Sequence, residues 1–279
     1  MKVKACAKIN LTLDIVGKRC DGYHIIDSVF QSVNLFDEIF IEKSSGITVG
    51  CSVGSIDNQN NIVYKAAEKF FENTKINGGA AIEIKKNIPL AAGLGGGSAD
   101  AAAVIVALDR LYETNLSNEQ ICSIGLSVGA DVPFCTVGGT ARVGGIGEII
   151  EKLPDIPDCA VLIIKHGQKQ STAEMYKKID TYPDTPLGTQ GMLSGIEKGD
   201  LYRICQNVSN AFSKVSYNQE LINNIKTTKP LAVSLSGSGP AVFAIYENAQ
   251  KAETALQKLT VMGYNPVIAA PINKGVIFE

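Results

Sequence analysis

Apolar and polar positions alternate along the first part of the chain in a way that predicts strands. Residues 2–16 place leucine and β-branched side chains at alternate positions, with an interruption near Lys8. A second strand signal covers residues 28–43 and a third covers residues 80–86. We therefore expect three strands before residue 90.

Three helices are expected between these strands and residue 130. The first covers residues 61–72, with Asn60 as the candidate N-cap. The second is rich in alanine and ends at about Tyr112. The third runs from about Ser117 to Val128, and a capping box between Ser117 and Gln120 marks its start.

Pro154 and Pro157, which flank acidic residues, interrupt the pattern and indicate a domain boundary near residue 153. We expect an N-terminal domain of residues 1–153 and a C-terminal domain of residues 154–279. Beyond the boundary, Tyr182–Gly191 is rich in Pro, Gly and Thr and predicts a surface loop. The remaining expected strands are 160–164, 231–236 and 241–246, and the helices are 172–179, 208–215, 219–225 and 248–262. The mixture predicts an α/β or α+β protein.

Composition narrows the possible functions. The chain has 279 residues, 45% hydrophobic and 19% charged, as in an ordinary globular protein. A net charge of -2, with no Lys/Arg cluster interleaved with aromatics, argues against nucleic-acid binding. No apolar run approaches the ~20 residues of a membrane span, and the N-terminus lacks a signal-peptide core. We expect a cytoplasmic protein without a nucleic-acid or membrane partner.

The seven cysteines are scattered and form no C-x-x-C pair, and the only histidines are His24 and His166. A zinc site needs closely spaced ligand pairs, so no protein-bound metal is expected. We expect the cysteines to be small buried residues in a reducing compartment.

The most informative segment runs from Pro89 to Ser98 and reads P-L-A-A-G-L-G-G-G-S. We call it the glycine-rich segment. Four glycines between a strand and a helix allow close approach to a ligand, and the helix start attracts anions. The segment is neither a Walker P-loop nor G-x-G-x-x-G, because Ser98 occupies the last glycine position. The alternative interpretation is a flexible turn whose glycines allow the helix and the strand to pack closely.

The glycine-rich segment resembles the phosphate loop of the GHMP kinases, which reads P-x-x-x-G-L-G-S-S-A, with Gly96 and Gly97 replacing the serines. The variant resembles a branch that acts on a cytidine diphosphate sugar alcohol in non-mevalonate isoprenoid synthesis. The resemblance spans almost the whole chain. It implies a two-domain α+β GHMP-kinase fold, with an N-terminal ATP-binding α/β domain with a mixed sheet and a C-terminal ferredoxin-like α/β sandwich.

The same resemblance implies ATP and Mg²⁺ as cofactors. Ser98 can offer its hydroxyl to a phosphate or, through water, to Mg²⁺. Asn61 and Lys86 match positions that line the adenosine pocket; the alternatives are a helix cap and a surface lysine. The expected ATP-binding residues are Pro89, Gly93, Leu94, Gly95, Gly96, Gly97, Ser98, Asn61 and Lys86.

Two further segments, Ala7–Leu11 and Gly129–Phe134, resemble the catalytic segments of the branch. They imply Asp131 as the base that accepts the hydroxyl proton, and Lys8 beside it as the group that favours the ionised carboxylate. Phosphoryl transfer depends mainly on positioning and positive charge, so such a pair suffices chemically. If the resemblance is set aside, the alternative interpretation is that Asp131 is a turn or N-cap residue and that Lys8 is a solvated lysine on a strand.

A pocket for the cytidine diphosphate is implied by a third set of residues. Asp21-Gly22 is a turn signal that presents Tyr23 and His24 together. In the branch, Tyr23 stacks on the cytosine, His24 hydrogen-bonds to it and Tyr176 supplies the opposite face. The implied substrate-binding residues are Asn10, Tyr23, His24, Thr172, Tyr176, Gly237, Ser238 and Gly239.

The chain departs from the branch at two places. Lys165-His166-Gly167 stands where a proline is usual before the region of Tyr176. Asn207-Val208-Ser209-Asn210 replaces the usual Asn-x-Leu-Glu, which bears on packing between the domains rather than on catalysis. Gly138–Arg142 and Gly147-Glu148 also resemble the family, and we interpret them as a structural turn region.

The leading hypothesis is ATP-dependent phosphorylation of the 2-hydroxyl of a cytidine diphosphate-linked methylerythritol by a monomer or weak homodimer. A second hypothesis is a GHMP kinase for mevalonate or homoserine, which offer no base for Tyr23 and His24. A third is a non-catalytic nucleotide-binding module, since a fold does not fix a function. That hypothesis predicts loss of Lys8 or Asp131, and both are present.

Overall fold

The computed structural model describes residues 1–53, 60–168, 170–182, 187–216 and 218–279. Its strands are β1 (Lys2–Lys18), β2 (His24–Ser44), β3 (Thr48–Cys51), β4 (Gly79–Lys85), β5 (Thr140–Gly145), β6 (Ile149–Lys152), β7 (Ala160–Lys165), β8 (Ser209–Asn210), β9 (Ala232–Leu235), β10 (Ala241–Tyr246), β11 (Pro266–Ala269) and β12 (Val276–Phe278). Its helices are α1 (Ile62–Thr74), α2 (Gly96–Tyr112), α3 (Asn118–Val128), α4 (Val132–Val137), α5 (Thr172–Ile179), α6 (Thr189–Glu197), α7 (Leu201–Gln206), α8 (Gln219–Lys226) and α9 (Ala249–Val261), with a 3₁₀ helix, η3, at Ala211–Lys214.

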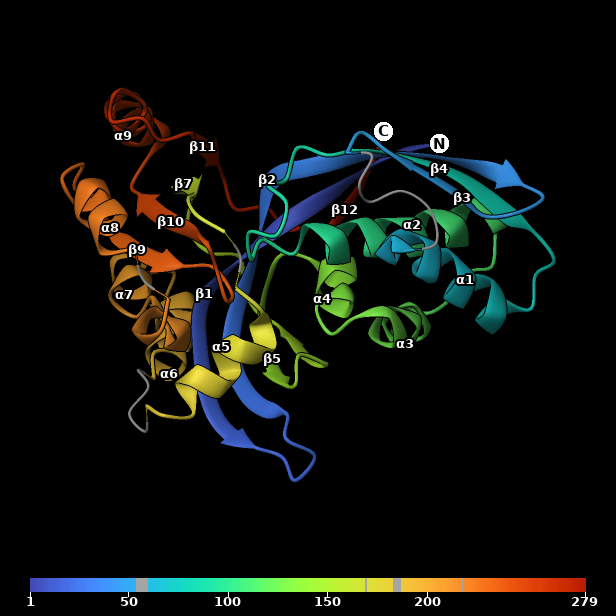
Figure 1. Cartoon of the computed structure of the whole chain (residues 1–279), viewed down its shortest axis with the longest axis horizontal. Coiled ribbons are helices and arrows are strands. Elements are labelled where there is room, and N and C mark those ends of the chain that lie inside the picture. Colours follow the sequence, from blue (N-terminus) through green and yellow to red (C-terminus); the bar gives the residue numbers. More distant parts are fainter. Residues whose placement is uncertain (54–59, 169, 183–186, 217) are drawn as a thin grey trace.

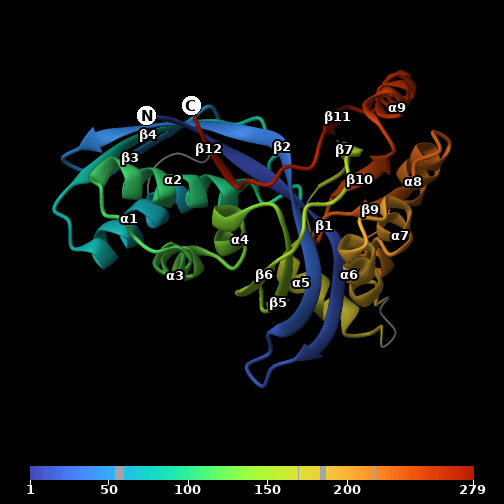
Figure 2. The ribbon, with the colours of Figure 1, turned by 180° about the vertical axis from the view of Figure 1, so that it is seen from behind.

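The first sheet has the order β12-β1-β2-β4-β3, with β5 on β2, β6 on β5 and β8 on β1. β1 and β2 form one long antiparallel pair whose register shifts near Cys6, Asn10 and Ile15. The interruption predicted near Lys8 is therefore a set of irregularities inside a continuous strand. Past its contacts with β4 and β12, the pair extends between the two halves of the molecule (Figure 2).

Helices α1 to α4 cover one face of this sheet (Figure 1). The alanine-rich helix α2 is central, and its buried Ala99, Ala101, Ala102 and Ala103 present small side chains to its neighbours. Small side chains allow a helix to approach a sheet closely, and interiors are packed densely. This packing holds the N-terminus of α2, and with it the glycine-rich segment, at a fixed place beside β1.

The second sheet is antiparallel throughout and has the order β11-β7-β10-β9. Strand β10 is buried at every position, as expected for a central strand with covered faces. In the described part of the chain, the strands beyond residue 153 belong to this sheet except β8 and β12, which return to β1. The division at residue 153 remains a prediction.

Three local predictions were wrong. The N-cap of α1 is Asn61, not Asn60, because the Asn61 side chain accepts from the Val63 N–H at 3.0 Å. Residues 208–215 form β8 and η3 rather than an α-helix, because Ser209 and Asn210 pair with β1. The predicted loop at Tyr182–Gly191 ends earlier: α6 starts at Thr189, capped by Asp14 of β1. Residues 183–186 of that loop lie outside the described residues.

The turn region predicted at Gly138–Arg142 is partly strand β5, where Arg142 forms an ion pair with Asp27 of β2 at 2.8 Å. Within the described residues none of the seven cysteines forms a disulfide. Four are buried as expected, but Cys20 is exposed and Cys51 and Cys122 are only half-buried. Burial raises the pKa of the Cys6 thiol to about 11. None of the helices in the described residues combines the length and the hydropathy of a membrane span.

Candidate active site

The glycine-rich segment leads into the N-terminus of α2. Gly95 is the N-cap with a φ of +70°, and the N–H groups of Gly96, Gly97 and Ser98 have no partner among the described residues. Such free N–H groups, together with the helix dipole, form an anion-binding site. Lys8 of β1 donates its backbone N–H to the Leu94 carbonyl at 2.9 Å, so the segment is fastened to the first sheet.

The glycine-rich segment is also fastened to the second sheet. Ser236 Oγ donates to the Gly93 carbonyl at 2.9 Å, and the Ala241 N–H donates to the Ala92 carbonyl at 3.0 Å. A Cβ on Gly93 would lie 2.1 Å from the Ser236 carbonyl oxygen, so the two backbones approach closely only because residue 93 is glycine. Lys165 Nζ adds a bond to the Leu90 carbonyl at 2.7 Å.

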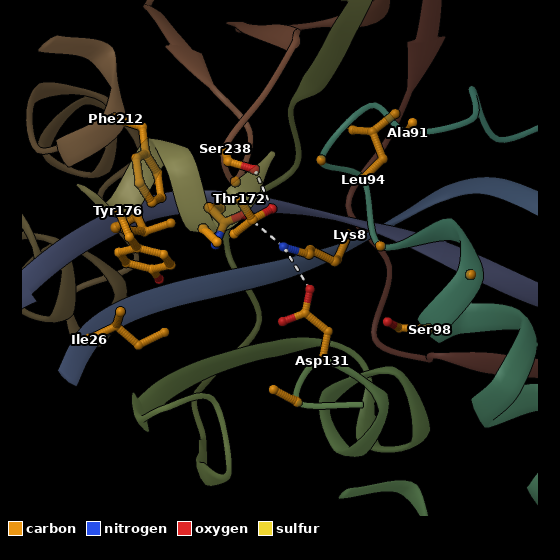
Figure 3. Close-up of a pocket in the computed structure, with 18 of the residues that line it drawn as sticks. Lys8, Ile26, Ala91, Leu94, Ser98, Asp131, Thr172, Tyr176, Phe212 and Ser238 are labelled. Atoms are coloured by element: carbon orange, nitrogen blue, oxygen red, sulfur yellow. Dashed lines mark hydrogen bonds and ion pairs between the residues drawn. The ribbon is translucent and has the colours of Figure 1, made fainter. Parts of the chain in front are cut away.

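Lys8 and Asp131 face each other beside this segment (Figure 3). Lys8 Nζ lies 3.3 Å from Asp131 Oδ2 and donates to Asn10 Oδ1 at 2.8 Å. It also lies 4.4 Å from the centre of the Phe30 ring, in cation–π geometry. The Lys8 side chain is 4% exposed and that of Asp131 36%, so a buried ammonium meets a carboxylate open to the cavity.

Asp131 stands at the N-cap position of α4, as the alternative interpretation allowed. Within the described residues, however, its side chain makes no capping hydrogen bond. It is directed instead toward Lys8 (Figure 3). The carboxylate is therefore left available for a partner that enters the cavity.

Lys86 lies in a buried ion cluster that the sequence did not suggest. Its ammonium contacts Asp37 of β2, and also Asp100 of α2 at 2.6 Å. Burial would lower the pKa of Lys86, but the charges of Asp100 and Asp37 outweigh it and the pKa is raised. Burial, followed by the charge of Asp37, raises the pKa of Asp100, whose Oδ1 is the one buried side-chain polar atom without a partner in the described residues. Lys86 is therefore buried, and the alternative interpretation of it as a surface lysine is wrong.

Aromatic side chains line the other end of the cavity. The His24 and Tyr176 rings are stacked, with centroids 4.5 Å apart and planes at 16°, and Phe212 meets Tyr176 edge-on at 4.9 Å. Tyr23 follows the tight Asp21-Gly22 turn and is 61% exposed. It is therefore His24 that lies against Tyr176 in this structure. Burial, and then the charge of Asp131, raises the pKa of Tyr176 to about 12, so its hydroxyl keeps its proton.

Asp180 is a cavity residue that the sequence did not predict. It follows α5 and binds both His24 Nε2 at 2.5 Å and Lys18 Nζ at 2.6 Å. His24 first, and then Lys18, lowers the pKa of Asp180. These partners are 156 and 162 residues away in sequence, and no local motif announces such a contact.

The turn at residues 236–239 closes the cavity between its two ends. Thr172 and Ser238 hydroxyls lie 3.2 Å apart, which connects α5 to this turn. The buried Asn210 side chain donates to the carbonyls of Leu235 and Gly237 at 2.8 and 2.9 Å, and accepts from the Phe212 N–H. An amide can make both donations, whereas the glutamate that is usual at this position in the resembling branch has no N–H to donate.

A cavity of about 830 Å³ joins these parts. The predicted site residues that line it are Lys8, Asn10, Tyr23, His24, Lys86, Pro89, Gly93, Leu94, Gly95, Gly96, Gly97, Ser98, Asp131, Thr172, Tyr176, Gly237 and Ser238. In the part of the chain that is described, Asn61 and Gly239 are not in its wall. Asn61 instead caps α1, which was its alternative interpretation. One cavity therefore holds an anion site, a lysine–carboxylate pair and an aromatic end.

Family models match both halves of the chain. The model described as the GHMP kinases N terminal domain matches residues 61–139, and the model described as the GHMP kinases C terminal matches residues 192–265. A curated 4-diphosphocytidyl-2-C-methyl-D-erythritol kinase of Caldicellulosiruptor bescii is 43% identical over 94% of this chain and 94% of its own length. One from a Thermoanaerobacter species is 40% identical over 99% of this chain and 98% of its own.

Solved structures show the same similarity. The crystal structure of a 4-(cytidine 5'-diphospho)-2C-methyl-D-erythritol kinase superposes with a TM-score of 0.82 at 29% identity, covering 97% of this chain and 99% of that one. A homoserine kinase from Cytophaga hutchinsonii superposes with a TM-score of 0.76 at 20% identity, over 99% of this chain and 96% of that one. At that identity the second match shows the fold alone.

Proposed function

The chain belongs to the 4-diphosphocytidyl-2-C-methyl-D-erythritol kinase family of the GHMP kinases, and on that premise we propose that it phosphorylates the 2-hydroxyl of this cytidine diphosphate substrate with ATP. The products are the 2-phosphate and ADP, in isoprenoid precursor synthesis by the non-mevalonate pathway. Family membership confirms the resemblance and the two-domain α+β fold predicted from the sequence. The observation that carries the proposal is the single cavity that joins the Lys8–Asp131 pair to an anion site and an aromatic end.

The residues at the start of α2 fit the phosphates of ATP. Free N–H groups on Gly96, Gly97 and Ser98 offer donors, and the positive end of the helix dipole favours negative charge. We assign Lys86, in the same wall, to the adenosine side of the nucleotide. Asn61 caps α1 outside this wall, and its contact with the adenosine stays a prediction from the resemblance. The wall between Pro89 and Ser98 is thus assigned to the nucleotide.

The donor set also fits Mg²⁺ held mainly by phosphates. No three acidic, cysteine or histidine side chains gather as a metal site within the described residues, and Ser98 offers a hydroxyl, directly or through water. When bound, Mg²⁺ neutralises charge on the phosphates. We assign no other metal ligand to the chain.

Asp131 and Lys8 would then carry the chemistry. The Asp131 carboxylate accepts the proton of the 2-hydroxyl as that oxygen bonds to the γ-phosphorus of ATP and the bond to the bridging oxygen of ADP breaks. Lys8 holds the carboxylate at 3.3 Å and places positive charge where the phosphoryl group passes. Because Lys8 is nearly buried and held by Asn10, its position is fixed before substrate binds.

The remaining wall residues suit the cytidine diphosphate. Thr172 and Ser238 lie between Lys8 and Tyr176, where the diphosphate would lie (Figure 3). Asn10, which accepts from Lys8, lines the same cavity. Gly237 and Gly239 shape the turn beside them. Tyr23, His24 and Tyr176 supply rings and a ring nitrogen for the base.

The competing substrates mevalonate and homoserine have no base, and this aromatic end would serve no purpose for them. A direct test measures ADP release with Mg-ATP against the cytidine diphosphate substrate, mevalonate, homoserine and galactose. We expect turnover with the cytidine compound alone. Turnover with another compound instead would overturn the substrate assignment. If none of the four compounds leads to ADP release, a non-catalytic nucleotide-binding module would be favoured.

A further inference from the structure

The orientation of the His24 imidazole is fixed by contacts on two sides. Its plane stacks on Tyr176 at 4.5 Å, and its Nε2 lies 2.5 Å from Asp180 Oδ1. The other carboxylate oxygen, Oδ2, binds Lys18 Nζ at 2.6 Å. The His24 side chain is only 7% exposed, so the ring has little freedom to turn.

Asp180 also decides which ring nitrogen carries the proton. An ionised carboxylate only accepts hydrogen bonds, so Nε2 must carry the hydrogen. His24 and Lys18 hold the pKa of the Asp180 carboxyl below its ordinary value, as expected for an ionised group. In the neutral imidazole, Nδ1 is then a hydrogen-bond acceptor.

Nδ1 is available to a ligand. It has no hydrogen-bond partner in the described residues, and it is not among the buried atoms that lack one, so solvent reaches it. Because His24 lines the cavity, we infer that this access is from the cavity side. An acceptor of fixed direction therefore faces the aromatic end.

Such an acceptor distinguishes the two pyrimidines. Cytosine presents an amino donor at position 4, whereas uracil presents an acceptor oxygen there. We propose that Asp180 is a specificity-determining residue that acts through His24: it holds Nδ1 as an acceptor for the cytosine amino group and so rejects uracil. The proposal rests on the proposed function, which places a cytidine diphosphate in this cavity. One such contact discriminates bases by about 5- to 150-fold.

Asp180→Asn is the decisive variant. Lys18 attracts the amide oxygen, which turns the amide N–H₂ toward His24 and requires Nε2 to accept. The hydrogen then moves to Nδ1, which becomes a donor suited to uracil. We expect the ratio of kcat/KM values for the cytidine and uridine substrates to fall at least tenfold, with kcat for the cytidine substrate little changed. Glu174→Gln, a matched change at an exposed position on α5, is expected to keep the wild-type ratio.

Calorimetric titration with CDP and UDP measures the same base preference as a ratio of dissociation constants, without turnover. If the wild type does not phosphorylate the cytidine substrate, the proposed function fails; a preference for CDP that Asp180→Asn abolishes would still support the inference. If the wild type prefers cytidine and Asp180→Asn keeps that preference, the inference is overturned while the function stands.

Nitrogen NMR of the imidazoles tests the cause directly. The chain has only two histidines, so His166→Gln assigns the His24 signals. We expect the wild type to show the hydrogen on Nε2 and Asp180→Asn to show it on Nδ1. A hydrogen on Nδ1 in the wild type would overturn the inference, whatever the binding data show.

Discussion

Replacing Asp131 by asparagine removes the proposed proton acceptor with the smallest change of shape. The amide keeps an oxygen that Lys8 can bind, so the hydroxyl of the substrate can still be oriented. What is lost is the negative charge 3.3 Å from Lys8 Nζ and the ability to take up a proton. The variant therefore separates proton transfer from positioning.

The expected loss of turnover follows from this geometry. General-base catalysis contributes about 10²- to 10⁴-fold, which corresponds to roughly 3–5 kcal/mol. At 3.3 Å and an effective dielectric constant of ~20, the attraction between the two charges is about 5 kcal/mol, an upper bound because Asp131 is 36% exposed. We expect kcat to fall at least 100-fold.

ATP affinity is expected to change little, because the ion pair of Asp131 in the described residues is with Lys8 and not with the glycine-rich segment that would hold the phosphates. Loss of a partly exposed ion pair costs ~1 kcal/mol or less, which for a chain of this size lowers the melting temperature by about 2–4 °C. The assay combines coupled ADP release, titration with a fluorescent ATP analogue, and thermal unfolding. Asp155→Asn, an exposed carboxylate outside the cavity, is the control. A kcat of Asp131→Asn within tenfold of the wild type would refute the assignment.

Three further predictions concern the walls of the cavity and the turn at residues 236–239. Gly93→Ala places a Cβ 2.1 Å from a carbonyl oxygen at a φ of +82°, so we expect it to lose at least ~2 kcal/mol in urea unfolding and to raise the KM for ATP. Gly97→Ala, whose Cβ meets only a side chain at 3.4 Å, should be close to wild type in urea unfolding, and an equal loss of stability in the two variants would contradict the close approach. Tyr23→Ala should raise the KM for the cytidine substrate about 5- to 150-fold, and an unchanged KM would count against stacking. Asn210→Asp turns a donor to two carbonyls into an acceptor, and should lower the free energy of unfolding by at least ~2 kcal/mol; a neutral effect in urea unfolding would show that those two bonds do not hold the turn.

Features set by neighbouring residues could be predicted from the sequence. The capping box of α3 is present as expected, because Ser117 and Gln120 satisfy each other across three residues. The glycine-rich segment was located because its chemistry depends on backbone N–H groups and on glycine, which are visible in the sequence. The N-cap of α1 was placed one residue too early, at Asn60 instead of Asn61, because two adjacent asparagines can both serve as a cap.

Features set by contacts across the fold could not be predicted. Asp14 accepts from the first N–H groups of α6 across 175 residues, so the start of α6 at Thr189 was taken for loop and the rest of the helix was not predicted. Lys86 contacts Asp37 and Asp100 over separations of 49 and 14 residues, and neither aspartate belongs to a local motif. The interaction of His24 with Asp180 is of the same kind. In each case the charge was visible in the sequence, but its partner was fixed only by the packing of the sheets and helices.

The most direct test of the central claim is phosphorus NMR of the product formed by the wild-type chain from the cytidine diphosphate substrate and Mg-ATP. The carbon that bears the 2-hydroxyl also bears the methyl group and carries no hydrogen. A phosphate at that position therefore gives a monoester signal without three-bond coupling to a proton, accompanied by an equal amount of ADP. We predict this signal. A monoester signal split by carbon-bound protons would place the phosphate on another hydroxyl, and ADP without a new monoester would mean that the chain hydrolyses ATP without transferring its phosphoryl group.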